Sequence, residues 1–404
     1  MIYLLLVLLL LSGYGIVHTY LVFPWLCWKN ETKALESQQR VDQRKYKLPK
    51  QDWPEVALLM AVHNEEFVLR QKLDASLRQD YPGELRLYIG CDNCTDDSWP
   101  ILEDYMQRYP KRVFASKNPR RMGKPKTINR LYAALDQDDQ HSVLWLTDAS
   151  VIPANDCLGE LVRPLLADPT IVLVDAQQLH TGIEADGISR SEDSYINREA
   201  RLKQAESRKY GYLIGPFGGC YVLRAEYFSS VPDNFLVDDF YLCMAAYEKG
   251  GRGISAPRAR AYEGVGQQLG DEFRRKVRIA SGNWQNLIRF RRLWWPPIKS
   301  LNFAFFSHKV LRWWTPFLAL LFISCLSLLA FQFGNYWAQL ALYGIILVVV
   351  LPVSLDLILR LMGKHYLLLR NWRYFIAMNL ALLLGFFRYL KGVKTNVWQP
   401  SKRH

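Results

Sequence analysis

The sequence predicts an α/β domain, with a mainly parallel sheet and helices on both faces, enclosed between apolar segments. Short apolar runs alternate with helix-compatible stretches from Val56 to Thr147, and such alternation argues for parallel βαβ units. The chain begins with an almost uncharged, Leu-rich stretch and carries three further apolar stretches after Trp313. The region between these ends holds roughly 280 residues, which is long enough for one sizeable domain.

Each expected strand ends at a polar turn. The turn after the first strand, His63–Glu66, opens a helix that runs to about Arg78, and the turn Cys91–Asp97 opens another. The chain contains neither a Walker A loop nor a G-x-G-x-x-G fingerprint, so P-loop NTPases and dinucleotide-binding enzymes are poorly supported. The four expected strands are 56–62, 85–90, 113–116 and 143–147.

Acidic residues stand where an α/β sheet binds ligands. Asp148 directly follows the fourth strand, at the carboxyl edge where open α/β folds place their ligands. Asp238 and Asp239 are adjacent about ninety residues later, and a carboxylate near a ligand can act as a general base. A solvated surface is the ordinary place for such a pair, and the order of the surrounding elements makes this pair informative.

Charge and cysteine content narrow the class of protein. The net charge of +13 is concentrated in Phe273–Arg278 and Arg289–Trp295. Arg interleaved with Trp beside apolar sequence is typical of a membrane interface rather than of nucleic-acid binding. Of the seven cysteines, only Cys91 and Cys94 have C-x-x-C spacing, and no second pair completes a zinc site. This usage predicts reduced, inert thiols in a domain that faces the cytosol.

Seven motifs in chain order resemble those of the family-2 glycosyltransferases, which are inverting nucleotide-sugar enzymes with the Rossmann-like GT-A fold. The resemblance runs from about Val56 to the C-terminus, where Val397–Arg403 is similar to the tail of membrane-bound members. Each motif is short, so the order and spacing of the set carry the resemblance. The motifs are Ala61–Glu66, Asp92–Asp96, Arg121–Asn129, Thr147–Ser150, Pro216–Arg224, Asp238–Asp239 and Arg274–Gly282.

The resemblance implies a donor site for a nucleotide-diphosphate sugar, usually a UDP-sugar. Asp92 is expected to accept a hydrogen bond from the base, with Glu65 and Asp96 beside the base and ribose. A helix N-cap fits Asp96 equally well. Lys124 is expected to face the diphosphate as a point charge, with an exposed loop position as the alternative. The implied donor-side residues are Glu65, Asp92, Asp96, Lys124 and Asn129.

The resemblance also implies the catalytic groups. Asp148 is expected to bind Mg²⁺ or Mn²⁺ that bridges the two phosphates and stabilises the departing nucleotide diphosphate. Asp239 is expected to take the proton of the acceptor hydroxyl, while Asp238 orients the loop or contacts the acceptor. Arg278 is expected to place positive charge over the leaving group.

On the acceptor side the resemblance implies the Gly-rich segment with Gly218 and Gly219, together with Arg275 and Trp284. For Arg275 a solvated or lipid-facing position fits as well. Two positions depart from the family pattern. Ser150 stands where synthases usually have the second Asp of Asp-x-Asp, and the processive Gln-x-x-Arg-Trp motif is replaced by Arg275–Ile279. The second departure disfavours polymer synthesis.

The apolar segments set the expected domains and topology. Segments 315–333 and 337–359 are each long enough to span a bilayer and are expected to form a hairpin. Segment 374–389 is shorter and is expected to be re-entrant or interfacial. Basic residues after the first span place the catalytic domain and the tail in the cytosol by the positive-inside rule. The expected domains are 1–28 (membrane anchor), 50–285 (cytosolic GT-A domain), 286–314 (interfacial amphipathic segment) and 315–404 (transmembrane region and basic tail).

The expected protein is therefore a multi-pass enzyme of the cell membrane that moves one sugar to a lipid-linked or membrane-adjacent saccharide acceptor. One alternative is a processive polysaccharide synthase, for which so few spans suggest an export or synthase partner subunit. Another is a catalytically degenerate regulatory subunit that only binds sugar nucleotides. The intact set of Asp92, Lys124, Asp148 and Asp239 argues against the second alternative.

Overall fold

The computed structural model describes residues 1–29, 53–135, 142–181, 189–264, 269–364 and 366–397. These residues belong to two compact units. The α/β unit comprises Asn30–Ile183, Asn197–Gly266 and Val393–His404, and the helical unit comprises Met1–Lys29, Glu184–Ile196 and Gln267–Gly392. The basic residues that follow the first apolar segment, and the final residues 398–404, lie outside the described residues.

The α/β unit is built on an eight-stranded sheet with the order β3-β2-β1-β4-β7-β6-β8-β5. The first four strands pair in parallel, which confirms the predicted βαβ units. Beyond β4 the sheet is mixed, because β7 runs antiparallel between β4 and β6. The strands are β1 (Val56–Val62), β2 (Leu85–Cys91), β3 (Val113–Lys117), β4 (Val143–Thr147), β5 (Val151–Pro153), β6 (Ile171–Thr181), β7 (Cys220–Arg224) and β8 (Arg252–Gly264).

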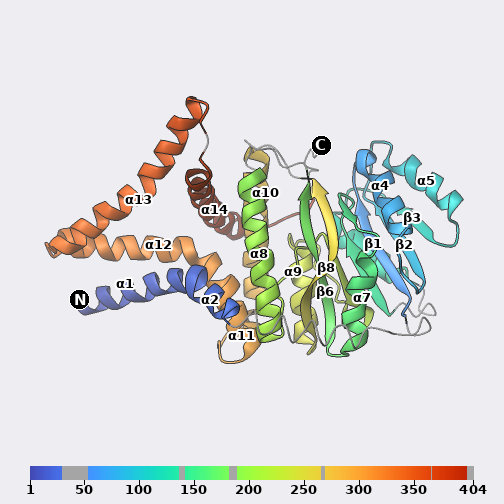
Figure 1. The fold of residues 1–404 in the computed structure, drawn as a ribbon, viewed down its shortest axis with the longest axis horizontal. Coiled ribbons are helices and arrows are strands. Elements are labelled where there is room, and N and C mark those ends of the chain that lie inside the picture. The colour runs from blue at the N-terminus through green and yellow to red at the C-terminus, as the bar shows by residue number, and fades with distance from the viewer. Residues whose placement is uncertain (30–52, 136–141, 182–188, 265–268, 365, 398–404) are drawn as a thin grey trace. The chain divides into compact units, whose positions relative to one another are not determined.

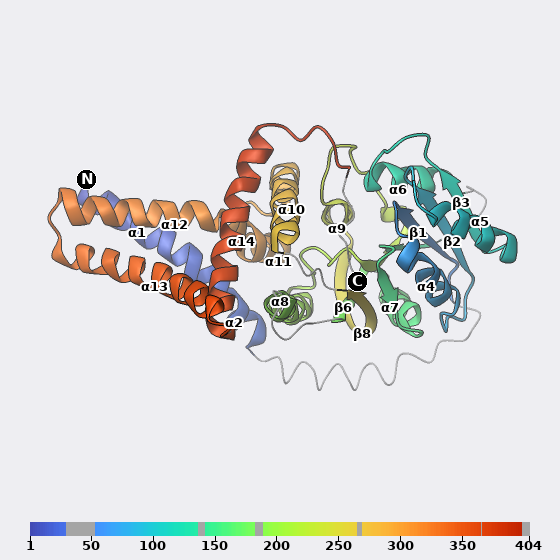
Figure 2. The same ribbon diagram turned by 90° about the horizontal axis from the view of Figure 1, so that it is seen from above.

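Helices cover both faces of the parallel part of the sheet (Figure 2). Every residue of β1 is buried, as a strand with helices on both sides requires. Alternate β1 residues share one hydrophobic core with α4 (Glu66–Leu77), α5 (Ser98–Arg108) and α7 (Cys157–Ala167). α6 (Lys124–Ala133) packs beside β1 and β2 from the other face. The remaining helices of this unit are α8 (Ser189–Tyr210), of which the first part belongs to the helical unit, and α9 (Asp238–Glu248).

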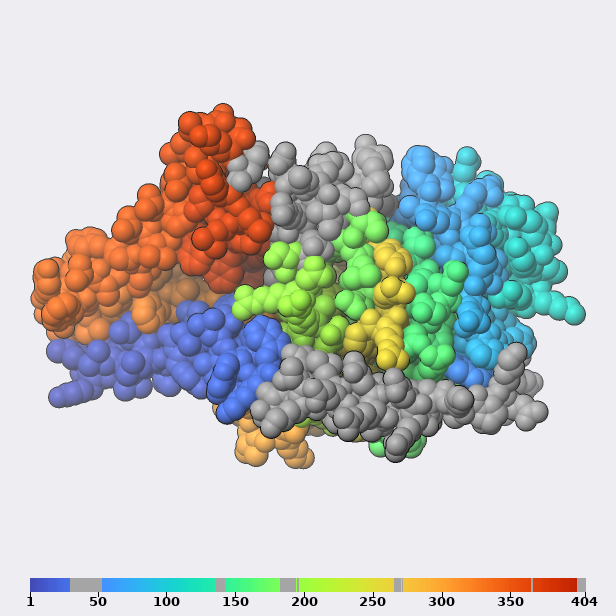
Figure 3. All heavy atoms as spheres, viewed as in Figure 1, coloured from blue at the N-terminus to red at the C-terminus, as the bar shows by residue number. Residues whose placement is uncertain are grey.

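Among its described residues, the helical unit contains four helical runs that are long and apolar enough to cross a membrane (Figure 1): Ile2–Trp28, Ser300–Gln332, Tyr336–Leu361 and Leu367–Leu390. Their apolar side chains are widely exposed, and those of the first run (blue) form much of the unit's surface in Figure 3. The helices are α1 (Ile2–Val17), α2 (Phe23–Trp28), α10 (Leu269–Arg289), α11 (Ser300–Phe305), α12 (Leu311–Ser327), α13 (Tyr336–Leu361) and α14 (Leu367–Leu390), with π-helical turns at His18–Val22, Phe306–Val310 and Leu328–Gln332.

Two segments are longer than the sequence predicted. The second helical run begins at Ser300, so part of the expected interfacial segment is continuous with the expected span. α14 has 24 residues and is about 36 Å long at 1.5 Å per residue, which is enough for a hydrocarbon core of ~30 Å. Asp356, which stands alone in the sequence of its span, is 3% exposed and accepts a hydrogen bond from Arg373 Nε at 2.5 Å. The pair connects α13 with α14. It also compensates the charge of Asp356, which would be costly to bury without a partner.

Candidate active site

The candidate active site lies where three elements of the α/β unit meet at the carboxyl edge of the sheet. Asp148 follows the last residue of β4, and β4 pairs with β7 so that Thr147 faces Cys220. This antiparallel pairing brings the segment before β7 beside Asp148, whose backbone N–H donates to Gly219 O at 3.1 Å. Lys124 is the first residue of α6 and Asp238 the first of α9. Helix N-termini and strand C-termini therefore converge here, as in other open α/β folds.

Lys124 connects the acidic residues of the site. Its Nζ lies 2.7 Å from Asp148 Oδ1 and 3.5 Å from Asp238 Oδ2. Its side chain is 23% exposed, Asp148 is 41% exposed and Asp238 is 11% exposed. Burial lowers the pKa of Lys124, but the charges of Asp148, Asp238 and Asp239 outweigh burial and raise it above its ordinary value. Lys124 therefore stays charged at every physiological pH, and the exposed loop position considered from the sequence does not apply.

Asp239 is a carboxyl group of this cluster whose pKa is raised. Burial and the neighbouring charge of Asp238 raise its pKa from 3.8 to about 6, against the opposing effects of Lys124 and of the backbone N–H of Phe240. That N–H donates to Asp239 Oδ1 at 2.7 Å. A carboxylate with a pKa closer to neutrality is a stronger base than an ordinary aspartate, which suits proton abstraction.

The Gly-rich segment before β7 is shaped around Asp239. Gly218 has φ +88°, and a Cβ at this position would lie 1.9 Å from Asp239 Oδ2. Only glycine combines this backbone conformation with so close an approach. Asp175 Oδ2 accepts a hydrogen bond from Phe217 N at 3.1 Å, and burial raises the pKa of Asp175 to about 7. The segment is therefore held directly against the expected base.

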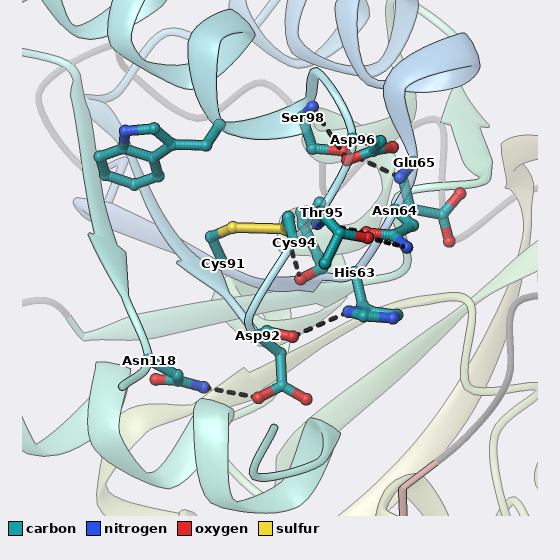
Figure 4. The surroundings of a disulfide bond; sticks show 12 residues. His63, Asn64, Glu65, Cys91, Asp92, Cys94, Thr95, Asp96, Ser98 and Asn118 are labelled. Atoms are coloured by element: carbon teal, nitrogen blue, oxygen red, sulfur yellow. Dashed lines mark hydrogen bonds between the residues drawn. A yellow bond between two sulfur atoms is a disulfide. The ribbon is translucent and has the colours of Figure 1, made fainter. Parts of the chain in front are cut away.

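Asp92 is buried in the turn after β2 (Figure 4). Its Oδ1 accepts hydrogen bonds from Asn118 Nδ2 at 2.9 Å and from Met122 N at 2.7 Å. Its Oδ2 accepts from Gly123 N at 2.9 Å. In this conformation Asp92 stabilises the loop that precedes Lys124 by accepting from its backbone N–H groups. Contact between Asp92 and a nucleotide base therefore requires these groups to rearrange. Its role as a base-binding residue stays a prediction.

The structure differs from the sequence prediction at the two cysteines that flank this turn. Cys91 and Cys94 form a disulfide with a Cα–Cα distance of 6.0 Å, whereas reduced thiols were expected. The turn brings the two Cα atoms within disulfide range, and Asn93 between them adopts φ +56°. The disulfide thus closes a short loop that contains Asp92.

Three expected donor-side residues have structural contacts in the α/β unit. Asp96 Oδ2 accepts from Glu66 N and its Oδ1 from Ser98 N, both at 3.1 Å, so its carboxylate satisfies the first N–H group of α4 and of α5, while the N-cap positions belong to Glu65 and Asp97. Asn129 exchanges two hydrogen bonds with the backbone of Val231, at 2.8 and 3.0 Å. Glu65 precedes α4, and its backbone N–H donates to Ser98 Oγ at 2.9 Å. Direct contacts of these three residues with substrate stay predictions.

The remaining expected site residues lie on α10 in the helical unit. Arg275 pairs with Glu272 at 2.9 Å, and Arg278 is half-buried. Burial raises the pKa of Glu272, but the charges of Lys276 and Arg275 outweigh it and lower this pKa to about 2. Trp284 is 3% exposed and packs against the rings of Trp314, Phe317 and Phe386. The substrate roles of Arg275, Arg278 and Trp284 stay predictions.

Sequence reasoning overlooked one residue beneath the site. Lys72 on α4 is 0% exposed and donates to Thr147, the last residue of the strand that precedes Asp148. Its position was detectable, because Leu69 lies three residues before Lys72 and Ser76 four residues after it, which places the three on one face of the helix. A lysine on the apolar face of a helix is unusual unless it is paired.

The mixed α/β sheet, with a lysine and three aspartates at its carboxyl edge, has the GT-A fold. A mannosyltransferase from Pyrobaculum calidifontis, solved in complex with GDP-Man and Mn²⁺, has the same fold, with a TM-score of 0.66 over 95% of this chain and 99% of that one, at 19% identity.

The chain belongs to glycosyltransferase family 2. The family described as "Glycosyltransferase like family 2" matches residues 54–282, which is more than half of the chain and includes Asp92, Lys124, Asp148 and Asp239. A probable glycosyltransferase of Bacillus subtilis, YdaM, is 30% identical over 118 residues, which is 28% of this chain and 27% of that protein. A beta-monoglucosyldiacylglycerol synthase of Synechocystis is 31% identical over 120 residues, which is 29% of this chain and 24% of that protein. The matches thus cover about a quarter of each relative.

Proposed function

We propose that this glycosyltransferase moves a single sugar from a UDP-sugar to a lipid-linked or membrane-adjacent acceptor, with inversion at the anomeric carbon. The observation that carries the proposal is the bridge that Lys124 makes between Asp148 and Asp238, at 2.7 and 3.5 Å, beside the raised pKa of Asp239. One cluster therefore offers a cation for a diphosphate, a carboxylate for a metal and a base for a hydroxyl.

The donor set at Asp148 fits Mg²⁺ or Mn²⁺. Among the described residues, no three His, Cys, Asp or Glu side chains are grouped as a complete metal site. Ser150 stands where a second carboxylate is common, so Asp148 supplies the main protein ligand. Mg²⁺ commonly binds through one or two carboxylates plus water and substrate phosphates, and carboxylate and water ligands also suit Mn²⁺. Such a cation would neutralise charge that develops on the departing nucleotide diphosphate.

The protein's own groups account for the other parts of the transfer. Lys124 turns its charge towards the diphosphate and stabilises the charge that the leaving group acquires. Asp239 accepts the proton of the acceptor hydroxyl as that oxygen forms its bond to the anomeric carbon. The bond between that carbon and the phosphate oxygen breaks in the same displacement, so the nucleotide diphosphate leaves from the opposite side. Gly218 permits the acceptor segment to approach Asp239 without a clash.

A lipid-linked acceptor is supported by the helical unit. Among the described residues, four apolar helical runs accompany the catalytic unit, and such runs would keep the enzyme beside a membrane-bound acceptor. The Synechocystis relative is named for a glucosyl lipid, and the family match extends to residue 282, close to the first of the C-terminal helical runs. A partner subunit for export was expected only if the protein were a processive polysaccharide synthase. No surface among the described residues supports such a partner.

The test of this proposal is nucleotide release by the full-length protein in detergent, with extracted membrane lipids as acceptor. UDP-glucose, UDP-galactose, UDP-N-acetylglucosamine and GDP-mannose serve as donors, and the Asp239→Asn variant sets the background. Release of UDP with a glycolipid product of one added sugar supports the proposal. Release from GDP-mannose alone corrects the donor, a long polymer favours the processive alternative, and no release above background from any donor contradicts transferase activity with these donors.

The pH dependence of kcat/KM should report the raised pKa of Asp239. A general base works in its deprotonated form, so kcat/KM is expected to rise with pH through the folded-state pKa of about 6. Below that value the rate should fall about tenfold per pH unit, and above pH 7 it should be level. Initial rates at low donor and acceptor concentrations from pH 5 to 8 measure this profile, because kcat/KM reports the pKa values of the free enzyme. A rate that is independent of pH over this whole range would contradict the assignment.

We further propose that the catalytic unit and the tail both face the cytosol. Asn396 is 3% exposed and donates to Asp233 O at 2.5 Å, so the tail belongs to the same side as the α/β unit. The runs Ser300–Gln332 and Tyr336–Leu361 return the chain to the side from which it left. A full crossing by α14 would then separate the tail from Asp233, so α14 lies in the membrane without crossing it.

Reporters test this topology. A fluorescent or enzymatic reporter after His404 is expected to be active on the cytosolic side, and one inserted at Gly334, between the two crossing runs, on the external side. Activity of both reporters on the same side would contradict the arrangement. An external reporter after His404 would make α14 a complete span.

A further inference from the structure

Lys72 is a buried lysine to which the proposed mechanism gives no role. It lies on α4, and its side chain is entirely buried beneath the sheet. Its Nζ donates to Thr147 Oγ1 at 2.7 Å and to Val151 O at 2.5 Å. The ring of Trp145 is 5.8 Å away. Within the part of the chain that the structure describes, no acidic side chain forms an ion pair with it. Burial of an ammonium group without a directly paired carboxylate costs free energy, so a buried lysine beside a candidate active site suggests a functional role.

The two acceptors of Lys72 bracket the loop that carries Asp148. Thr147 is the last residue of β4, and Val151 is the first of β5. The loop between them is closed by a backbone bond from Val151 N to Asp148 O at 3.3 Å. It is tied to the acceptor segment by Thr147 Oγ1, which donates to Gly219 O at 2.9 Å, and by Asp148 N, which donates to the same carbonyl. Lys72 on α4 thus binds both ends of the loop from the buried interior of the unit.

We propose that Lys72 is a positioning residue, which fixes the loop 147–151 so that the Asp148 carboxylate is held ready for a divalent cation. The inference rests on the proposed function, in which Asp148 is the principal protein ligand of that cation. A site with a single carboxylate cannot rely on other protein ligands to orient the metal, so it depends strongly on the rigidity of its loop.

A lysine suits this position for a physical reason. The ammonium group of a lysine provides three hydrogen-bond donors. The lysine side chain is long enough to bring these donors from α4 to both ends of the loop. Burial lowers the pKa of Lys72 to about 8, so the charged form still prevails at neutral pH. Its positive charge also lies beneath the acidic cluster, where Asp148 contributes to its electrostatic environment.

The rival explanation is that Lys72 contributes to stability alone. The two explanations differ in the metal response, because a residue that only stabilises the fold leaves metal affinity unchanged in the fraction that is folded. Lys72→Met keeps an unbranched side chain and removes the donors. Leu69→Ala is the matched control, since Leu69 is also 0% exposed on α4 and its truncation weakens the same helix without touching the loop. Thr147→Val keeps the shape of the side chain and removes one acceptor of Lys72, together with the hydroxyl that donates to Gly219 O.

The experiment measures the Mn²⁺ concentration for half-maximal UDP release by the full-length enzyme, together with thermal unfolding of each variant. Lys72→Met is expected to raise this midpoint about tenfold or more, the usual effect of losing a group that orients a metal ligand. Thr147→Val is expected to raise it in the same direction by a smaller factor. Leu69→Ala is expected to lower the unfolding temperature and keep the midpoint within about twofold, since metal orientation is unaffected.

An unchanged midpoint in a folded Lys72→Met variant overturns the inference while the proposed function stands. If Lys72→Met does not fold, an unchanged midpoint in Thr147→Val overturns it instead. A wild-type enzyme that releases UDP without any divalent cation overturns the role of Asp148, and with it the role of Lys72.

Discussion

Asp239→Asn is expected to lower the turnover of sugar transfer by roughly 10²–10⁴-fold, the usual contribution of a positioned general base. The substitution removes a proton acceptor and preserves the size of the side chain. The affinity for UDP should remain within a few-fold of the wild-type value, because the substitution removes an interaction that is made only in the transition state. Turnover at saturating donor and UDP binding by calorimetry measure the two effects separately.

Asp233→Asn provides the matched control for this substitution. Asp233 lies in the loop before α9, its side chain is 64% exposed, and it pairs with Lys126 at 2.8 Å. An exposed pair of this kind contributes little to stability, so the control variant should keep nearly full turnover. Retention of most activity by Asp239→Asn would remove Asp239 from the mechanism, and an equal loss in both variants would point to a disturbed loop.

Asp148→Ala is expected to weaken donor binding and turnover together. The change removes the principal protein ligand of the cation and the closest acidic partner of Lys124, at 2.7 Å. Metal neutralisation of a leaving group contributes several kcal/mol, and about 1.4 kcal/mol corresponds to a factor of ten in rate. We therefore expect a loss of about 10²-fold or more in turnover, which excess Mn²⁺ restores only in part.

Treatment of the wild-type enzyme with excess EDTA should reproduce the loss seen in Asp148→Ala. Asp104→Ala on α5 is the matched control, because Asp104 is an exposed aspartate whose partners, Arg70 and Arg108, are exposed as well. Full activity in EDTA would show that the basic residues alone stabilise the diphosphate. Asp148 would then be a structural partner of Lys124.

The first half of the sheet could be predicted from the sequence because its signals are local. Each of β1 to β4 is a short apolar run that ends at a polar turn, and the observed bounds agree closely with the expected ones. The second half could not be predicted, since the antiparallel insertion of β7 depends on pairing between β4 and a strand more than seventy residues later. No local periodicity encodes the partner of a strand.

Individual site residues show the same division. The order of the motifs indicated Lys124, Asp148 and Asp239 as parts of one site, and the structure gathers them with Asp238 at one edge. Asp96 and Asn129 carry the residue types of a binding site, yet their oxygen atoms hold helix N-termini and a loop backbone. A side-chain oxygen can accept a hydrogen bond from a ligand or from a backbone N–H group. Only the folded structure shows which of these donors is close to it.

The sequence by itself therefore determined the family, the four parallel strands and the apolar segments, because residue type, order and hydrophobic periodicity are properties of the chain. Tertiary structure alone decided three features: the ion bridge of Lys124, the pairing of Asp356 with Arg373, and the burial of Lys72 beneath the loop of Asp148. Each of these places a charged group beside a partner that is distant in sequence. The free energy of a charge depends on its burial and its neighbours, and folding supplies both.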